Sequence, residues 1–206
     1  MVYKWSWGLA AAAVQTLIYF VIGRAHIERS TEMLRTRLDD AIPLLPITAW
    51  FYLPVYAGIF IIAIVGFRTR LHFDRALSGV GLIMLVGVVG HLVVRAEYPR
   101  PVLVAPYATL SEWFLAQVQA IDPPGNVFPS LHVAHTSSLA LILWHENRRL
   151  GRVVIGLAAL LAVSTLTTKQ HFVVDVVAGF ALAALARLAV LRGVPASPTT
   201  GRATAA

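Results

Sequence analysis

Residues 76–94 read ALSGVGLIMLVGVVGHLVV and contain no Lys, Arg, Asp or Glu. A helix needs about 20 mainly apolar residues to cross a bilayer, so this stretch predicts a membrane-spanning helix. Five more apolar blocks are of comparable length; they cover residues 5–23, 47–66, 130–146, 153–168 and 172–191. We therefore predict an all-α fold, a polytopic membrane protein built as a six-transmembrane-helix bundle. The fourth and fifth spans in chain order are short and carry polar residues.

The overall composition excludes an ordinary soluble domain. Hydrophobic residues make up 58% of the 206 residues and charged residues 13%, whereas soluble domains carry about 25% charged residues. The net charge of +7 does not indicate nucleic acid, because the basic residues stand at the ends of apolar blocks without interleaved aromatics. The absence of cysteine excludes disulfides and thiolate chemistry.

The loop charges predict the orientation. With a cytoplasmic N-terminus, the inner segments hold nine Lys and Arg and the outer segments seven, and the inner loops are compact and nearly free of acids. This pattern follows the positive-inside rule. We expect both termini in the cytoplasm and the chain in the plasma membrane of a bacterium. Residues 5–23 are expected to be a retained anchor, because no small-residue cleavage site follows them.

Two outer segments and the C-terminus are interpreted separately. Apolar residues recur near helical spacing in residues 25–38 and 107–121, which predicts short amphipathic helices on the outer face or packed on the bundle. We expect residues 1–192 to form one catalytic transmembrane domain and residues 193–206 to be a flexible tail.

His171 and Asp175 interrupt the start of the last block. An ionisable residue inside an apolar span costs about 2.5–3.5 kcal/mol on insertion scales and therefore needs a reason. Residues four apart share one helix face. A carboxylate that accepts from one imidazole nitrogen makes the other a better nucleophile or base. The alternative is a structural His–Asp hydrogen bond between two helices.

The second polar cluster is Ser130, Leu131 and His132, which follow Pro129 at the start of a span. Pro suits the first turn of a helix. The unpaired N–H groups that follow it can hold an anion, and Ser130 adds a hydroxyl donor. The alternative is an ordinary helix start with a buried histidine.

The third polar cluster is the segment EYPRP, residues 97–101, just beyond the third span. Arg100 stands between two prolines, and its guanidinium matches the geometry of a phosphate. The alternative is a positively charged anchor at the interface. Lys169 precedes His171 by two residues and adds a point charge. The predicted topology places all three clusters on the same rim of the bundle.

In this order, the motifs resemble the type 2 phosphatidic acid phosphatase superfamily. That family carries a basic segment ending in Arg-Pro, then Pro-Ser-Gly-His, then a His followed four residues later by Asp. The match covers about residues 95–179, in the sequences RP at 100–101, PSLH at 129–132 and HFVVD at 171–175. The FPSLH and TKQHFVVD forms are most similar to the inositol phosphorylceramide synthase branch, as is DDAIP at 39–43.

The resemblance implies a catalytic set without metal or cofactor. His171 would attack phosphorus, oriented by Asp175, and form a phosphohistidine. His132 would protonate the leaving oxygen and then activate water or an alcohol. Positioning and charge stabilisation are what phosphoryl transfer mostly needs.

The same resemblance implies a set of phosphate-binding residues, although this sequence differs from the family's pattern at three positions. Arg100, Lys169 and the N–H groups near Ser130 and Leu131 would bind the phosphate oxygens. Leu131 replaces the family's glycine. The family's first-motif Lys falls on Val93 and its third-motif Arg on Thr165, so we expect Lys169, or else Arg95, to substitute.

These expectations favour a membrane lipid phosphatase that acts on a phosphomonoester or pyrophosphate of a lipid at the outer leaflet. A phosphotransferase that moves a phospho-headgroup such as phosphoinositol between lipids uses the same residues and stays open. The partners are a lipid phosphate or phospholipid and the membrane, not nucleic acid. Another open alternative is a metal-dependent membrane hydrolase using His132, His135, His171 and Asp175, although the neighbouring Arg would repel the metal. Transport is disfavoured because the charges gather at one rim rather than at midplane.

Overall fold

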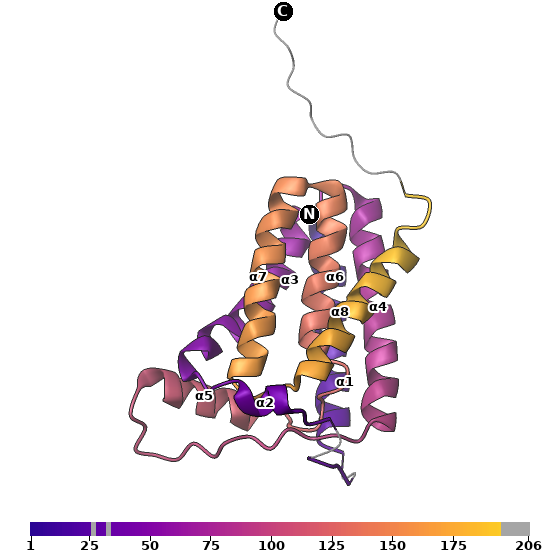
Figure 1. Cartoon of the computed structure of the whole chain (residues 1–206). Helices are drawn as coiled ribbons and strands as arrows, with labels where there is room; N and C mark the ends of the chain where they lie inside the picture. The colour runs from indigo at the N-terminus through magenta and orange to yellow at the C-terminus, as the bar shows by residue number, and fades with distance from the viewer. Residues whose placement is uncertain (26–27, 32–33, 195–206) are drawn as a thin grey trace, which may run out of the picture.

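The computed structural model describes residues 1–25, 28–31 and 34–194. Within these ranges the chain forms eight α-helices and one 3-10 helix, η1, and the prediction of an all-α fold is confirmed (Figure 1). The helices are α1 Val2–Gly23, α2 Arg37–Ala41, η1 Pro46–Phe51, α3 Leu53–Gly66, α4 Arg70–Val93, α5 Leu110–Ile121, α6 Leu131–Glu146, α7 Arg148–Thr167 and α8 Val173–Val190.

Five helical segments of the described chain are long and apolar enough to cross a membrane. They are α1, η1 with α3, α4, α7 and α8. They coincide with five of the six predicted spans, and α4 and α7 begin earlier than predicted because a side chain caps each of them. For example, α7 begins at Arg148 because Asn147 accepts a hydrogen bond from Leu150 N at 3.2 Å. The sixth block forms α6, which has 16 residues; that α6 crosses the membrane stays a prediction.

Helix α6 lies in the middle of the bundle, in contact with α3, α4, α7 and α8 (Figure 1). All ten residues from 131 to 140 are buried, among them two histidines, a threonine and two serines. Because protein surrounds these polar residues, none of them has to face lipid, where burying an unpaired polar group is costly.

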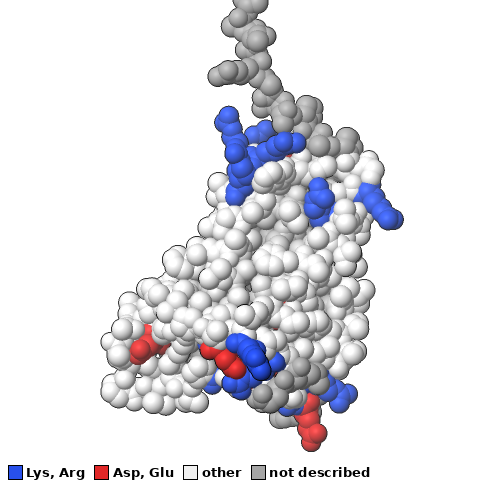
Figure 2. Space-filling view, viewed as in Figure 1, with Lys and Arg blue, Asp and Glu red and all other residues white. Residues whose placement is uncertain are grey.

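The two ends of the bundle differ. Helices α2 and α5 lie at the end opposite the N-terminus (Figure 1). Lys and Arg gather at the N-terminal end, whereas acidic and basic side chains mix at the other end (Figure 2). Helix α5 confirms the amphipathic helix predicted in residues 107–121. Thr109 begins it by accepting a hydrogen bond from Glu112 N at 3.1 Å.

The helix predicted in residues 25–38 is wrong for residues 25, 28–31 and 34–36, whereas residues 37–38 begin α2; residues 26–27 and 32–33 lie outside the described residues. Ser30 is extended and pairs with the segment after α4. Its N–H donates to Arg95 O at 2.8 Å, and Glu97 N donates to Ser30 O at 3.0 Å. This pairing satisfies the backbone groups that a helix would have satisfied.

Only the first two residues of the predicted flexible tail are described. Val194 packs against the core, its N–H donates to Leu191 O at 3.1 Å, and its carbonyl lies 3.1 Å from His145 Nε2. The folded part thus continues to Val194, and residues 195–206 lie outside the described residues.

Candidate active site

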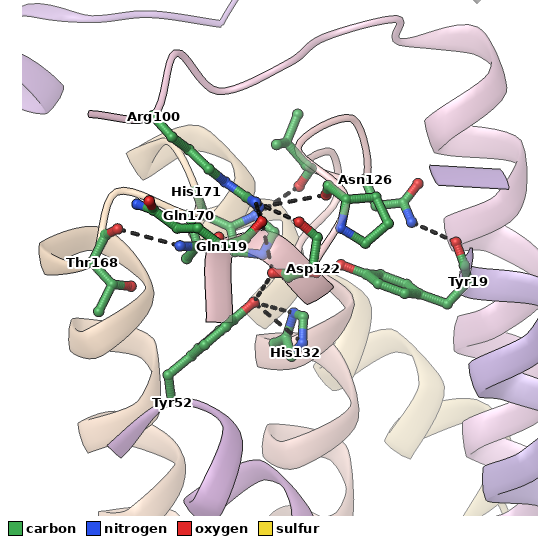
Figure 3. A network of polar contacts seen from close by, with 12 residues as sticks. Tyr19, Tyr52, Arg100, Gln119, Asp122, Asn126, His132, Thr168, Gln170 and His171 are labelled. Carbon is green, nitrogen blue, oxygen red and sulfur yellow. Dashed lines mark hydrogen bonds and ion pairs between the residues drawn. The ribbon is translucent and has the colours of Figure 1, made fainter. Parts of the chain in front are cut away.

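The three polar clusters meet at the end of the bundle that carries α2 and α5. His132 stands in the first turn of α6 and His171 in the loop between α7 and α8, with ring centroids 5.8 Å apart. Arg100 comes from the connection between α4 and α5, and its side chain reaches toward both histidines (Figure 3). Segments distant in the sequence therefore converge on one buried polar site.

His171 has a defined proton position. Its Nδ1 lies 3.1 Å from Val127 O and 3.4 Å from Asp175 Oδ2. A carbonyl oxygen only accepts hydrogen bonds, so Nδ1 carries the hydrogen and Nε2 keeps the lone pair. Burial lowers the pKa of His171 to about 4, although the charge of Asp122 acts to raise it. The ring is therefore neutral at neutral pH, with a nucleophilic Nε2.

Asp175 is fixed by the backbone around it. Its Oδ2 accepts from Phe172 N at 2.7 Å, which caps the start of α8, and its Oδ1 is buried without a partner in the described chain. Its own carbonyl accepts from Ser130 N at 3.1 Å, which joins the starts of α6 and α8. The predicted pairing of Asp175 with His171 is present, but not on one helix face, because His171 stands in the loop before α8 begins at Val173.

The start of α6 offers fewer free N–H groups than predicted. Ser130 N is bound to Asp175 O, so the expectation that it is free is wrong. Ser130 Oγ accepts from Val133 N at 3.4 Å and acts as the helix cap, while its hydroxyl hydrogen remains able to donate. For the N–H groups of Leu131 and His132, the described residues provide no acceptor.

Arg100 is held at the C-terminal end of α5. Its Nη1 donates to Gln119 O at 3.4 Å and Asp122 O at 2.5 Å, and its Nη2 to Pro123 O at 3.4 Å. Nη2 also lies 3.4 Å from Asp122 Oδ2. Nε is buried and has no partner in the described residues. These bonds fix the guanidinium and leave one N–H for a further acceptor.

The structure does not bring Lys169 into this cluster. Its backbone has a left-handed φ of 59°, and its Nζ donates to Asp39 O at 2.8 Å and to Ile42 O at 2.5 Å. The side chain thus braces the segment between α2 and η1. We find no support for the expectation that Lys169 replaces the missing family cations.

Asp122 and two tyrosines were missed by the sequence analysis. Asp122 Oδ1 accepts from Tyr19 OH at 2.5 Å and Oδ2 from Tyr52 OH at 2.7 Å (Figure 3). Tyr52 OH also lies 3.2 Å from His132 Nδ1 and 3.3 Å from its Nε2. The available signal was an acidic residue placed shortly before a span, on the same rim as the histidines. The tyrosines lie in apolar blocks and could not be distinguished there from interfacial aromatics.

The metal alternative required His135 to converge with His132, His171 and Asp175. Instead, His135 Nε2 lies 3.4 Å from Val80 O and its Nδ1 3.3 Å from Tyr56 OH. No group of three or more metal-binding side chains converges within the part of the chain that the structure describes. The residues present therefore do not fit the predicted metal site.

A cavity of about 270 Å³ leads to the site between α1 and α3. His132 and Asp122 lie among its lining residues, and Phe20, Leu53, Ala57 and Ile121 supply apolar wall. Helix α1 is largely exposed along its length and would face lipid in a membrane. An apolar chain lying against the bundle could therefore reach the polar site through this cavity.

The comparison with known proteins agrees with the motifs. A family model described as the PAP2 superfamily matches residues 23–189, which include every residue of the site except Tyr19. No curated protein and no solved structure gives a significant match.

Proposed function

The chain belongs to the PAP2 superfamily and is a phosphatase or phosphotransferase of that family, and from this premise we propose that it hydrolyses a phosphomonoester or pyrophosphate of a lipid through a phosphohistidine at His171. The observation that carries the proposal is the arrangement of the two histidine rings. They lie 5.8 Å apart, and the proton of His171 is held on Nδ1 by Val127 O and Asp175.

In the proposed reaction, His171 Nε2 attacks phosphorus while the bond from phosphorus to the leaving oxygen breaks. His132 gives its proton to that oxygen. In the second step His132 takes a proton from water, whose oxygen displaces His171 and releases phosphate. We assign the stabilisation of the phosphoryl oxygens, which carry most of the transition-state charge, to Arg100 Nε and to the N–H groups of Leu131 and His132, for which the described residues provide no acceptor.

A lipid is the proposed substrate because the apolar cavity between α1 and α3 reaches His132. Transfer to a lipid alcohol is the second candidate. One observation favours it: Leu131, at the position of the family's glycine, also lines this cavity. An apolar side chain beside the acid–base histidine disfavours water and suits an acceptor that carries an alkyl chain. The likeness to the inositol phosphorylceramide synthase branch points in the same direction.

A panel of substrates tests the proposal. Purified protein would be incubated with a lipid monophosphate, a lipid pyrophosphate and a phosphoinositide-type phospholipid, each with and without a long-chain alcohol and with and without EDTA. We expect release of inorganic phosphate from at least one lipid phosphate, unaffected by EDTA. New phosphorylated lipid formed only with the alcohol would assign the transferase. Loss of activity in EDTA with recovery in zinc would refute the metal-independent mechanism.

The pH dependence follows from the state of His171. Its folded pKa of about 4 lies below the ordinary value of 6.5, so the nucleophile stays neutral as pH falls from 7 to about 5. We expect protonation of the nucleophile to cause no loss of kcat/KM, corrected for the ionisation of the substrate phosphate near pH 6, over this range and to lower it only as pH falls through about 4. An acidic limb centred near 6.5 would contradict a buried nucleophile.

We further propose that α6 is a sixth span, that both termini are cytoplasmic and that the active site faces outward in a bacterial plasma membrane. The native chain has no cysteine, so single cysteines report orientation. Val102 is 85% exposed at the active-site end, and Arg149 is exposed at the other end. A membrane-impermeant maleimide applied to intact cells should label Val102→Cys and not Arg149→Cys. The reverse pattern would place the substrate in the cytoplasmic leaflet.

A further inference from the structure

A second carboxylate, that of Asp122, is linked to His132 by the hydroxyl group of Tyr52. We propose that Asp122 and Tyr52 are positioning residues for His132: the Tyr52 hydroxyl links the Asp122 carboxylate to the imidazole and holds His132 ready to protonate the leaving oxygen. This inference rests on the proposed function, in which His132 is the general acid.

The direction of the hydrogen bonds supports this role. An ionised carboxylate only accepts hydrogen bonds, so Tyr52 OH donates to Asp122 Oδ2, at 2.7 Å. The Tyr52 oxygen is then free to accept from an N–H of His132, whose two nitrogens lie 3.2 and 3.3 Å away. The chain from carboxylate to hydroxyl to imidazole is therefore continuous and has one consistent direction.

The packing keeps this arrangement in place. Tyr52 is completely buried, and its ring centroid lies 4.7 Å from that of His132. Asp122 is 6% exposed and is held from two further sides, by Tyr19 OH at Oδ1 and by Arg100 Nη2 at Oδ2. A rigid hydrogen-bonded partner restricts the acid–base imidazole to one orientation, as a carboxylate does in other catalytic histidines.

The charge of Asp122 also fits the chemistry of the first step. His132 must be protonated before the leaving oxygen departs, and a buried imidazolium needs a nearby negative charge. Asp122 supplies that charge through Tyr52. During the step, the His132 proton moves to the leaving oxygen as the phosphorus–oxygen bond breaks and the bond from His171 Nε2 to phosphorus forms. Tyr52 keeps its proton and Asp122 its charge throughout, so neither is consumed.

A pair of substrates with different leaving groups tests the role. The leaving group of decyl phosphate is an alkoxide, which needs a proton from the general acid. The leaving group of 4-decyl-2-nitrophenyl phosphate is a stable phenolate, which does not. General acid catalysis contributes about 10²–10⁴-fold. We expect Tyr52→Phe to lower kcat/KM about 10- to 100-fold for decyl phosphate and less than about threefold for the nitrophenyl ester. Asp122→Asn should show the same selectivity, and Asp122→Glu should recover part of the loss.

Tyr56→Phe is the matched control. Its ring also lies 4.7 Å from His132, but its hydroxyl contacts Gln15 and His135 instead. This variant should change kcat/KM for both substrates by the same factor. Equal losses for both substrates in Tyr52→Phe would overturn the positioning role. If His132→Ala itself shows no dependence on the leaving group, the proposed acid fails instead, so the two failures are distinguishable.

Discussion

Replacing His171 with alanine is expected to lower kcat by about 10⁴-fold or more, because the covalent step then has no nucleophile. In the native protein, Nδ1 of His171 is bound to Val127 O, which leaves the lone pair of Nε2 for the attack. A reaction with lipid [³²P]phosphate, stopped in denaturant within milliseconds, should leave acid-labile and base-stable label on the native chain. Peptide mapping should place that label on His171, and His171→Ala should carry none.

His145→Ala provides the control for this experiment. His145 lies at the other end of the bundle, where its Nε2 contacts Val194 O, and the variant should keep both turnover and label. Phosphate trapped on a residue other than His171 would contradict the assignment. Residual turnover in His171→Ala near the native rate would do so as well, because direct attack by water would then suffice.

The bundle and the common rim could be predicted from the sequence because the membrane imposes simple rules. A helix that crosses the hydrocarbon must satisfy its backbone internally, so apolar length alone located five spans. Ionisable residues within such blocks are costly, and His171 with Asp175 stood out for that reason. Alternating the direction of the spans then placed Arg100 and His132 on the same rim without any knowledge of packing.

The contacts of individual polar side chains could not be predicted in this way. Lys169 turns away because its left-handed backbone directs Nζ to two carbonyls of the segment after α2. Asp122 joins the site only because the end of α5 folds back beneath Arg100, a tertiary contact between residues 22 positions apart. Ser30 is extended and not helical because its backbone pairs with the segment after α4. All three depend on connections outside the spans, where hydropathy carries little information.

The second large effect is expected at Asp175. Asp175→Asn keeps the size of the side chain but replaces one carboxylate oxygen with an amide N–H₂. The remaining oxygen can still accept from Phe172 N, the bond that now holds Oδ2 at 2.7 Å. That oxygen is also the one that lies 3.4 Å from His171 Nδ1, so the amide N–H₂ takes the place of Oδ1, which has no partner in the described chain, and the negative charge is lost. Without that charge, the positive charge that develops on the imidazole when Nε2 attacks phosphorus is no longer stabilised.

We therefore expect Asp175→Asn to fold normally and to lower kcat by about 10³–10⁴-fold, as the same exchange does for another carboxylate that orients a catalytic imidazole. The measurement is pre-steady-state labelling of His171 beside the thermal unfolding midpoint of both proteins in detergent. Slow formation of phosphohistidine with an unchanged midpoint is the expected result. If His171 in the Asp175→Asn variant is phosphorylated at the native rate, the charge of Asp175 is not needed and Val127 O alone holds the tautomer. If its unfolding midpoint drops along with its activity, the carboxylate acts instead as the cap that holds Phe172 N at the start of α8.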